Sequence, residues 1–304
     1  MTPPPETDAT PATASGTAAD FVLPRHADSF GRRLRRRLNP PLLWGAFIIF
    51  VLALGAYVVP AIWQFGAEAA NPREALLPPS ARHPFGTDRS GFDIFVRVFH
   101  APRIDLTIVV LGVGLGALIG IVLGVAAGFS RRLMGEFSMR LADIVQAFPL
   151  LILAIALVAL GGNNLTNVVF VLAFVNAPVF LRLVRSRVLT VREQRYIAAA
   201  AALGNSTTRL VFRHVLPNSL GPAVVQFGIS MGYGILTLAG LAYLGVGVQV
   251  PTPEWGSMIL GGASYITTGQ WWISIFPGIF LAIAVFAFNL LSEGIEQARE
   301  VHLR

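Results

Sequence analysis

The stretch that decides the fold is a polar segment between two apolar blocks, residues 192–218, which reads REQRYIAAAAALGNSTTRLVFRHVLPN. Alanine has the highest helix propensity, so the run 198–202 predicts a short helix. Gly204 is a typical helix stop, and Asn205 and Ser206 can cap a second short helix. Pro217 disfavours helical geometry at the residue before it, so we expect the second helix to end there.

The composition around this segment is that of an integral membrane protein. Of 304 residues, 54% are hydrophobic and 13% are charged, whereas a soluble domain has about 25% charged residues. The absence of cysteine excludes disulfides, and the absence of lysine excludes a Walker A phosphate loop. Any ATP-driven work therefore needs another subunit. The net charge of +7 comes from arginines beside apolar spans, which favours positive-inside topology over nucleic-acid binding.

Apolar runs and flanking charges predict an all-α membrane protein with six transmembrane helices and both termini in the cytoplasm. We expect a disordered tail with a basic juxtamembrane cluster over residues 1–39, a first span over 40–65 and a periplasmic or extracellular segment over 66–103. A core over 104–291 then holds the other five spans, and residues 292–304 form a cytoplasmic tail.

Turn signals and prolines divide the core. Its spans lie within residues 106–130, 144–181 (two spans), 219–248 and 272–291. The sequence Gly-Gly-Asn-Asn at 161–164 predicts a tight hairpin between the paired spans, and Pro149 and Pro178 predict kinks in them. Before the core, residues 92–99 predict a short amphipathic helix lying flat on the outer membrane interface.

Positive charge places the opening segment inside the cell. Only Glu193 opposes the arginines that follow the fourth span, at positions 182, 185, 187, 192, 195, 209 and 213. Because arginine is enriched in cytoplasmic loops, we expect two cytoplasmic coupling helices over 192–217.

The spacing of Ala199-Ala200, Gly204 and Leu216-Pro217 resembles the cytoplasmic coupling motif of ABC importer permeases. Ala198 stands where that family usually has glutamate, and His214 where it usually has isoleucine. Further segments, which begin at 83 (HPFGTD), 251 (PTPEWGSM) and 276 (FPG), resemble the second permease of dipeptide, oligopeptide and nickel systems. The resemblance extends from about residue 83 to residue 293.

This resemblance implies a type I ABC importer permease in a bacterial inner membrane, where it forms half of a translocation path for peptides, nickel or a related solute. It implies a second homologous permease, one or two ATPase proteins that use ATP and magnesium, and an extracytoplasmic substrate-binding protein as partners. The chain itself would contact membrane lipid, bind no cofactor, metal or nucleic acid, and catalyse no reaction.

The resemblance also assigns candidate residues. We expect Ala199, Ala200 and Gly204 to pack closely on the ATPase, and Leu216 and Pro217 to form a rigid helix exit. Arg209 and Arg213 are expected to pair with acidic ATPase residues. The other candidate coupling residues are Tyr196 and Ala198. Separately, Gln226, Ser230 and Thr237 recur at helical spacing on one stripe of the fifth span. That stripe either lines the translocation path or makes hydrogen bonds between helices.

Two other classes of function compete with this interpretation. An ion-coupled secondary transporter normally places ionisable groups inside its spans, and the inner portions of these spans have none. An intramembrane serine hydrolase could use Ser264, but all five histidines lie outside the spans, which leaves no obvious base.

Overall fold

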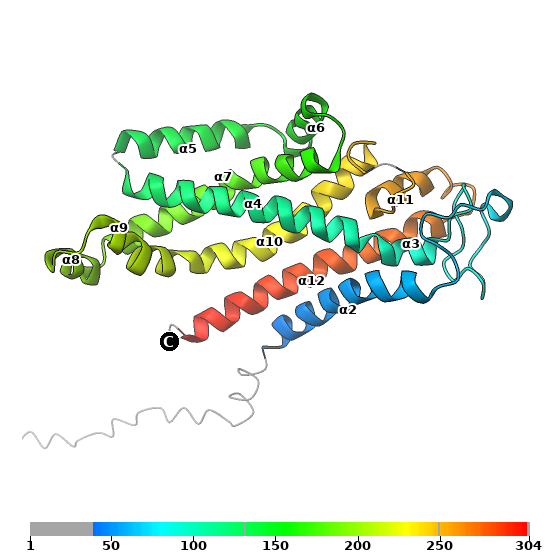
Figure 1. Ribbon diagram of the computed structural model, residues 1–304, viewed down its shortest axis with the longest axis horizontal. Coiled ribbons are helices and arrows are strands. Elements are labelled where there is room, and N and C mark those ends of the chain that lie inside the picture. The colour runs from blue at the N-terminus through cyan, green and yellow to red at the C-terminus, as the bar shows by residue number, and fades with distance from the viewer. Residues whose placement is uncertain (1–38, 131, 249, 303–304) are drawn as a thin grey trace, which may run out of the picture. The chain divides into compact units, whose positions relative to one another are not determined.

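The computed structural model describes residues 39–130, 132–248 and 250–302. The predicted tail, except for Asn39, lies outside this range, and so does all of its basic cluster. Within it the chain is helical, and its one β-bridge joins Thr87 to Asp93. The elements (Figure 1) are α2 (Pro40–Ile62), η1 (Pro72–Glu74), α3 (Ile94–His100), α4 (Pro102–Phe129), α5 (Arg132–Ala147), α6 (Leu150–Gly161), α7 (Leu165–Arg192), α8 (Arg195–Ala202), α9 (Thr207–Leu210), η2 (Val211–Val215), α10 (Leu216–Tyr243), α11 (Trp255–Ala263) and α12 (Trp272–His302). The predicted all-α class is confirmed.

Five helical segments are long and apolar enough to cross a membrane: Pro40–Ile62, Ile94–Phe129, Leu165–Arg192, Thr207–Tyr243 and Trp272–Arg299. A sixth span exists only if α5 and α6 are counted together, because they meet at an angle of 94°. Pro149 is the N-cap of α6, so the predicted kink becomes a sharp break. The third span therefore begins earlier than predicted, and Glu136, Arg140 and Asp143 lie on α5 rather than in a loop.

Helices α4 and α7 pack along a row of glycines. Gly112, Gly116, Gly120, Gly124 and Gly128 recur every four residues on the face of α4 that meets α7. A methyl group on Gly116 would lie 2.7 Å from the Ala173 carbonyl oxygen, and one on Gly124 would lie 2.8 Å from that of Leu181. Small residues at this spacing allow close backbone approach in lipid, so this helix pair forms the centre of the core.

The other spans surround this pair. In α10, Gly234 packs against Val109 of α4, and Gly228 packs against Ser292 of α12. Helix α2 lies against α12, where Gly45 faces the backbone of Leu291. Because α2 is mostly exposed in the isolated chain, it forms one edge of the bundle.

The sequence predicted that residues 92–99 form a helix lying flat on the membrane interface, but α3 does not lie in this way. It continues into α4, and Ile94, Val96 and Val98 are buried among α2, α11 and α12. Asp93 begins the helix by accepting a hydrogen bond from the backbone N–H of Val96 at 3.1 Å. Tertiary cover on its apolar sides replaces the membrane surface that its amphipathic pattern suggested.

Candidate functional site: the coupling segment and the opposite end of the bundle

Helices α8 and α9 form a projecting pair at one tip of the bundle (Figure 1). Helix α8 stops at Gly204, whose φ of +83° is a left-handed conformation that favours glycine. The backbone N–H of Gly204 donates to the Ala201 carbonyl at 2.9 Å, and Ser206 Oγ accepts from the N–H of Arg209 at 3.4 Å. The predicted stop and cap are confirmed.

The predicted end of the second helix at Pro217 is wrong. Leu216 is helical, with φ −56° and ψ −53°, and α9, η2 and α10 form one continuous run from Thr207 to Tyr243. The turn Val211–Val215 is a π-helix, in which the N–H of Leu216 donates to the carbonyl five residues back. Such a widened turn can relieve the clash of a proline ring with the preceding turn. Asn218 Nδ2 also donates to the His214 carbonyl at 2.6 Å.

Three apolar residues hold the coupling segment to the bundle. Ile197, Leu210 and Val215 are buried, and Ile197 is the buried residue of α8. None of the predicted coupling residues is buried. Two are half-buried, Ala200 and Leu216, and the others are exposed: Tyr196, Ala198, Ala199, Gly204, Arg209, Arg213 and Pro217. The segment thus presents most of its residues outward.

Sequence reasoning missed two prominent side chains of this segment. Leu203 is 85% exposed beside the Gly204 turn, and Phe212 is 66% exposed on the π-helical turn. Large apolar residues exposed together on a polar loop often mark a protein contact. The signal available in the sequence was an apolar residue directly beside the glycine stop.

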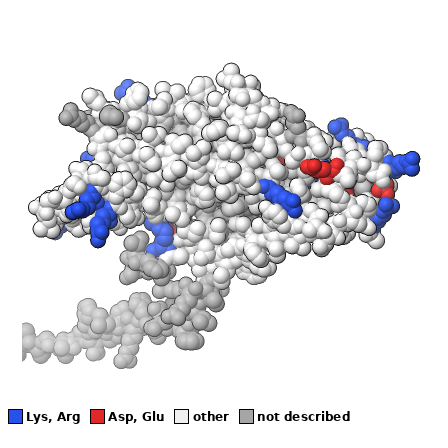
Figure 2. Space-filling view, in the orientation of Figure 1, with Lys and Arg blue, Asp and Glu red and all other residues white. Residues whose placement is uncertain are grey.

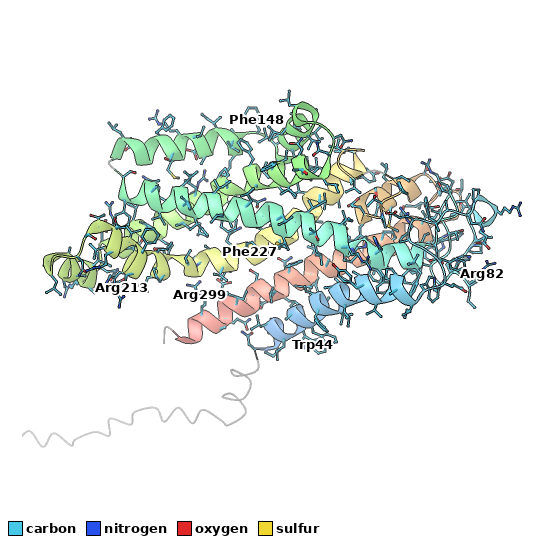
Figure 3. All side chains as sticks on the ribbon, in the orientation of Figure 1. Trp44, Arg82, Phe148, Arg213, Phe227 and Arg299 are labelled. Carbon is cyan, nitrogen blue, oxygen red and sulfur yellow. The ribbon has the colours of Figure 1, made fainter. Side chains whose placement is uncertain are left out.

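Charge at this tip is basic. Figure 3 places Arg213 there, and the charged side chains visible at the tip in Figure 2 are blue. In the described part of the chain, neither Arg209 nor Arg213 has an acidic side chain within ion-pair distance. Arg192 instead donates to the Gly128 carbonyl at 2.7 Å. Both arginines are therefore available to an acidic surface outside this chain.

The opposite end of the bundle, which carries Arg82 in Figure 3, buries several charged side chains in addition to its exposed ones. His83 Nδ1 lies 2.7 Å from Asp93 Oδ2, and the His83 ring stacks on Phe65 with centroids 4.5 Å apart. Arg97 Nη1 donates to the Ala67 and Pro251 carbonyls at 2.8 and 2.9 Å. These contacts join the segment after α2 to α3 and to the loop before α11.

Glu254 and Trp255 fix α11 to α3 and α4. The Glu254 carboxylate accepts from the N–H groups of Gly256 and Ser257 at 2.8 and 2.6 Å, and Trp255 Nε1 donates to the Val98 carbonyl at 3.0 Å. The Trp255 N–H also donates to Asp105 Oδ2 at 3.3 Å. Burial raises the pKa of Glu254 to about 7, although the hydrogen bonds from Ser257 and Gly256 oppose this shift.

The polar stripe of α10 makes hydrogen bonds within its own helix. Gln226 Nε2 donates to Ser230 Oγ at 3.2 Å, and Thr237 Oγ1 donates to the Tyr233 carbonyl at 2.8 Å. Ser230 and Thr237 are buried and Gln226 is half-buried. Tyr233 lies on the same stripe and is 67% exposed, so it is the polar residue of this stripe that most faces outward.

Comparison with known proteins adds the family. The model of a family described as binding-protein-dependent transport system inner membrane component matches residues 120–300, which include the coupling segment. The chain belongs to this family. This permease is therefore a multi-pass protein of a bacterial inner membrane, and the predicted family is confirmed.

Relatives of this permease match along most of its length. It is 38% identical to the dipeptide transport system permease protein DppC of Alkalihalophilus pseudofirmus, over 88% of this chain and 87% of that protein. It is also 38% identical to a di/tripeptide permease protein DppC of Pseudomonas aeruginosa, over 86% and 87% of the two chains. The oligopeptide permease protein OppC of Bacillus subtilis is 35% identical, over 89% and 88%.

A solved structure shares the fold. The structure of the MetNI methionine ABC transporter in inward-facing conformations matches with a TM-score of 0.55 and 20% identity, over 67% of this chain and 96% of that chain. This permease therefore has an ABC importer permease fold, as predicted, and an ion-coupled secondary transporter is not supported.

Proposed function

We propose that this permease forms half of the translocation path of an ATP-driven peptide importer and docks onto separate ATPase subunits through its coupling segment. The peptide cargo is supported by the relatives named above, whose descriptions specify dipeptides, di/tripeptides and oligopeptides. The single observation that carries the docking proposal is the projecting pair α8 and α9. Its backbone is capped internally, whereas Leu203, Phe212, Arg209 and Arg213 face outward.

The predicted coupling residues take specific roles in this proposal. The small side chains of Ala198, Ala199 and Ala200, with Gly204, allow close approach of the ATPase, and Tyr196 borders that contact. Apart from its chain neighbours, a methyl group on Gly204 would meet no heavy atom of the described residues within 4 Å, so space at this position is available to a partner. Leu203 and Phe212 would enter apolar pockets, while Arg209 and Arg213 would pair with acidic ATPase residues.

Motion of the ATPase would reach the membrane through the continuous helical run from Thr207 to Tyr243. Because the chain does not break at Leu216 and Pro217, displacement of α9 would move α10 directly. If the contacts between the coupling segment and the ATPase differ between the two ATPase states, they would shift the permease between inward- and outward-open states. The exposed face of α10, bordered by Gln226, Ser230 and Thr237 and carrying Tyr233, would form part of the path.

A second homologous permease would complete the path. Helix α5 carries a stripe of exposed large apolar residues, Leu133, Phe137, Leu141 and Ile144. Phe148 directly follows this helix, and α6 continues the apolar surface beyond the 94° break. Figure 3 labels Phe148 where the two helices meet. This bent apolar surface fits a protein partner better than parallel lipid chains. An external binding protein would deliver the peptide on the opposite end, and the ATPases would use ATP and magnesium.

The docking proposal is tested in the co-expressed complex with Leu203→Ser and with a double charge reversal, Arg209→Glu and Arg213→Glu. We expect each variant to lose most ATPase co-purification and ATP-dependent peptide uptake in proteoliposomes. Matched controls on the opposite end are Leu77→Ser and the pair Arg73→Glu and Arg89→Glu, which should retain the ATPase. Unchanged co-purification in both coupling variants would remove the docking proposal.

A further inference from the structure

An apolar groove runs between α4 and α7 on the side of the bundle away from the coupling segment. Its first part has a volume of about 470 Å³ and is lined by Arg103, Leu111, Leu115, Val169 and Phe170, among others. A second hollow of about 460 Å³ shares Leu115 and Phe170 and continues the groove toward Ala177. The groove therefore follows the helices, which is also the direction of lipid chains in a bilayer.

Arg103 lies at the end of this groove with its side chain already oriented. Its Nε donates to the Ala56 carbonyl at 2.7 Å, and its guanidinium carbon lies 4.5 Å from the centroid of the Tyr57 ring. In the described part of the chain, no acidic side chain lies within ion-pair distance of Arg103. The terminal nitrogens of the guanidinium thus remain available to an anion. A fixed guanidinium binds phosphate oxygens well because its donors form a planar fork.

The position of Arg103 along the chain also suits a residue that binds a lipid headgroup. It precedes the uncharged residues 106–130, and Thr107 and Thr166 also line this part of the groove. A basic residue at the edge of an apolar span normally reaches toward the lipid headgroups. A groove with a charged end and an apolar length fits an amphipathic ligand, which has a charged headgroup and an apolar chain.

We propose that this groove binds an anionic phospholipid, with one acyl chain between α4 and α7 and the phosphate on the Arg103 guanidinium. The arginine without an acidic partner favours this occupant over an apolar face of a second permease. The bent apolar surface of α5 and α6 offers that subunit a separate place. This inference rests on the membrane location of the family and does not depend on ATPase docking.

The test uses the full chain purified with its co-expressed subunits, freed of lipid in detergent and examined by native mass spectrometry. Phosphatidylglycerol and phosphatidylcholine with identical acyl chains are the probes, and glycerol phosphate tests the headgroup without chains. We expect phosphatidylglycerol to bind about tenfold more tightly than phosphatidylcholine, because a hydrogen-bonded charge pair is lost with a neutral headgroup. Glycerol phosphate should not bind at the same concentrations.

Two variants separate the halves of the site. Arg103→Gln should abolish the preference for phosphatidylglycerol, and Val169→Trp, which fills the groove, should weaken both lipids. Their controls are Arg73→Gln, an exposed arginine beyond the spans, and Leu118→Trp, on an exposed face of α4 outside the groove. Equal binding of the two lipids to the unmodified chain would overturn the proposal, as would full binding to both groove variants.

A second permease subunit is the competing occupant of the groove, and cross-linking tests for it. The chain has no cysteine, so Leu111→Cys introduces a single thiol into the groove. Cross-linking of this thiol to a second permease subunit would show that protein covers the groove and would contradict the lipid site. Loss of ATPase binding would leave these lipid results unaffected, so failure of the proposed function is distinguishable.

Discussion

The two ends of the bundle use polar residues in opposite ways. At the coupling tip, Arg209 and Arg213 are exposed and α8 buries Ile197. At the opposite end, the charged or polar side chains of His83, Asp93, Arg97, Asp105 and Glu254 are almost fully buried. Figure 2 shows acidic and basic side chains together at that end, whereas the visible charge at the α8 tip is basic.

This difference indicates where the structure is fixed and where it meets a partner. Buried charges are costly without partners, so their hydrogen bonds hold the opposite end in one arrangement. The exposed tip gains little from its polar residues within this chain. Changes at the buried end should therefore lower stability, whereas changes at the tip should lower association and spare the fold.

The largest expected effect is the loss of Trp255. Trp255→Ala removes a fully buried indole and its hydrogen bond to Val98, so we expect a loss of about 3–5 kcal/mol in the free energy of unfolding. Thermal unfolding of the purified chain in detergent measures the change. The matched tip variant, Phe212→Ala, should change stability by less than about 0.5 kcal/mol while weakening ATPase binding. Similar losses for the two variants would contradict the contrast between the ends.

A second prediction concerns the buried pair of His83 and Asp93. Asp93→Ala removes the His83 partner and the hydrogen-bond acceptor for the Val96 N–H, so stability should fall by about 3 kcal/mol. Its control is Asp143→Ala, which breaks the exposed ion pair with Arg182 and should cost less than about 1 kcal/mol. Unfolding midpoints in denaturant compare the two. Equal shifts would show that burial at His83 has no special role.

The third prediction is a pH dependence from Glu254. Its pKa rises from 4.5 to about 7 on folding, so between these values the folded chain holds a proton that the unfolded chain releases. Stability should therefore fall by about 3 kcal/mol as the pH rises through this window and then become level. Glu254→Gln should flatten the slope of melting temperature against pH, whereas the exposed control Glu293→Gln should retain it. An unchanged slope in Glu254→Gln would assign the effect to other groups.

Of the four positions whose change is expected to lower stability, Gly204 should have the smallest effect. Gly204→Ala places a side chain at a left-handed φ of +83° and should cost about 1 kcal/mol. Gly278→Ala is the control, because a methyl group there also meets no atom within 4 Å and the backbone φ is not left-handed. Thermal unfolding of both variants measures the difference. A neutral Gly204→Ala would show that the turn after α8 relaxes freely.

Local signals predicted the turn at the tip and the turn between α6 and α7 from sequence. The Gly204 stop, the Ser206 cap and the hairpin at 161–164 each depend on residues a few positions apart. The family followed from several such segments in order. Leu203 could have been noted as an apolar residue beside the glycine stop, but the exposure of Leu203 and Phe212 itself depends on which side of the pair faces the bundle.

Longer-range features were missed for physical reasons. The π-helical turn before Pro217 depends on how α9 is held against the bundle, and proline alone suggested a break. The cover on α3 and the contacts of Arg97 and Trp255 come from segments far apart in the chain. By contrast, the glycine row of α4 could have been recognised in the sequence from its four-residue spacing, and these glycines lie at the contact with α7.

The most direct test of the central claim is site-specific cross-linking from the tip in the assembled complex. Leu203→Cys gives a single thiol because the chain has no other cysteine, and Leu77→Cys is the control at the opposite end. We predict that the thiol at position 203 cross-links to an ATPase subunit with a yield that changes on ATP binding, and that the control does not. Absence of any ATPase product from position 203, or labelling of that thiol by an impermeant reagent from outside intact cells, would contradict the account.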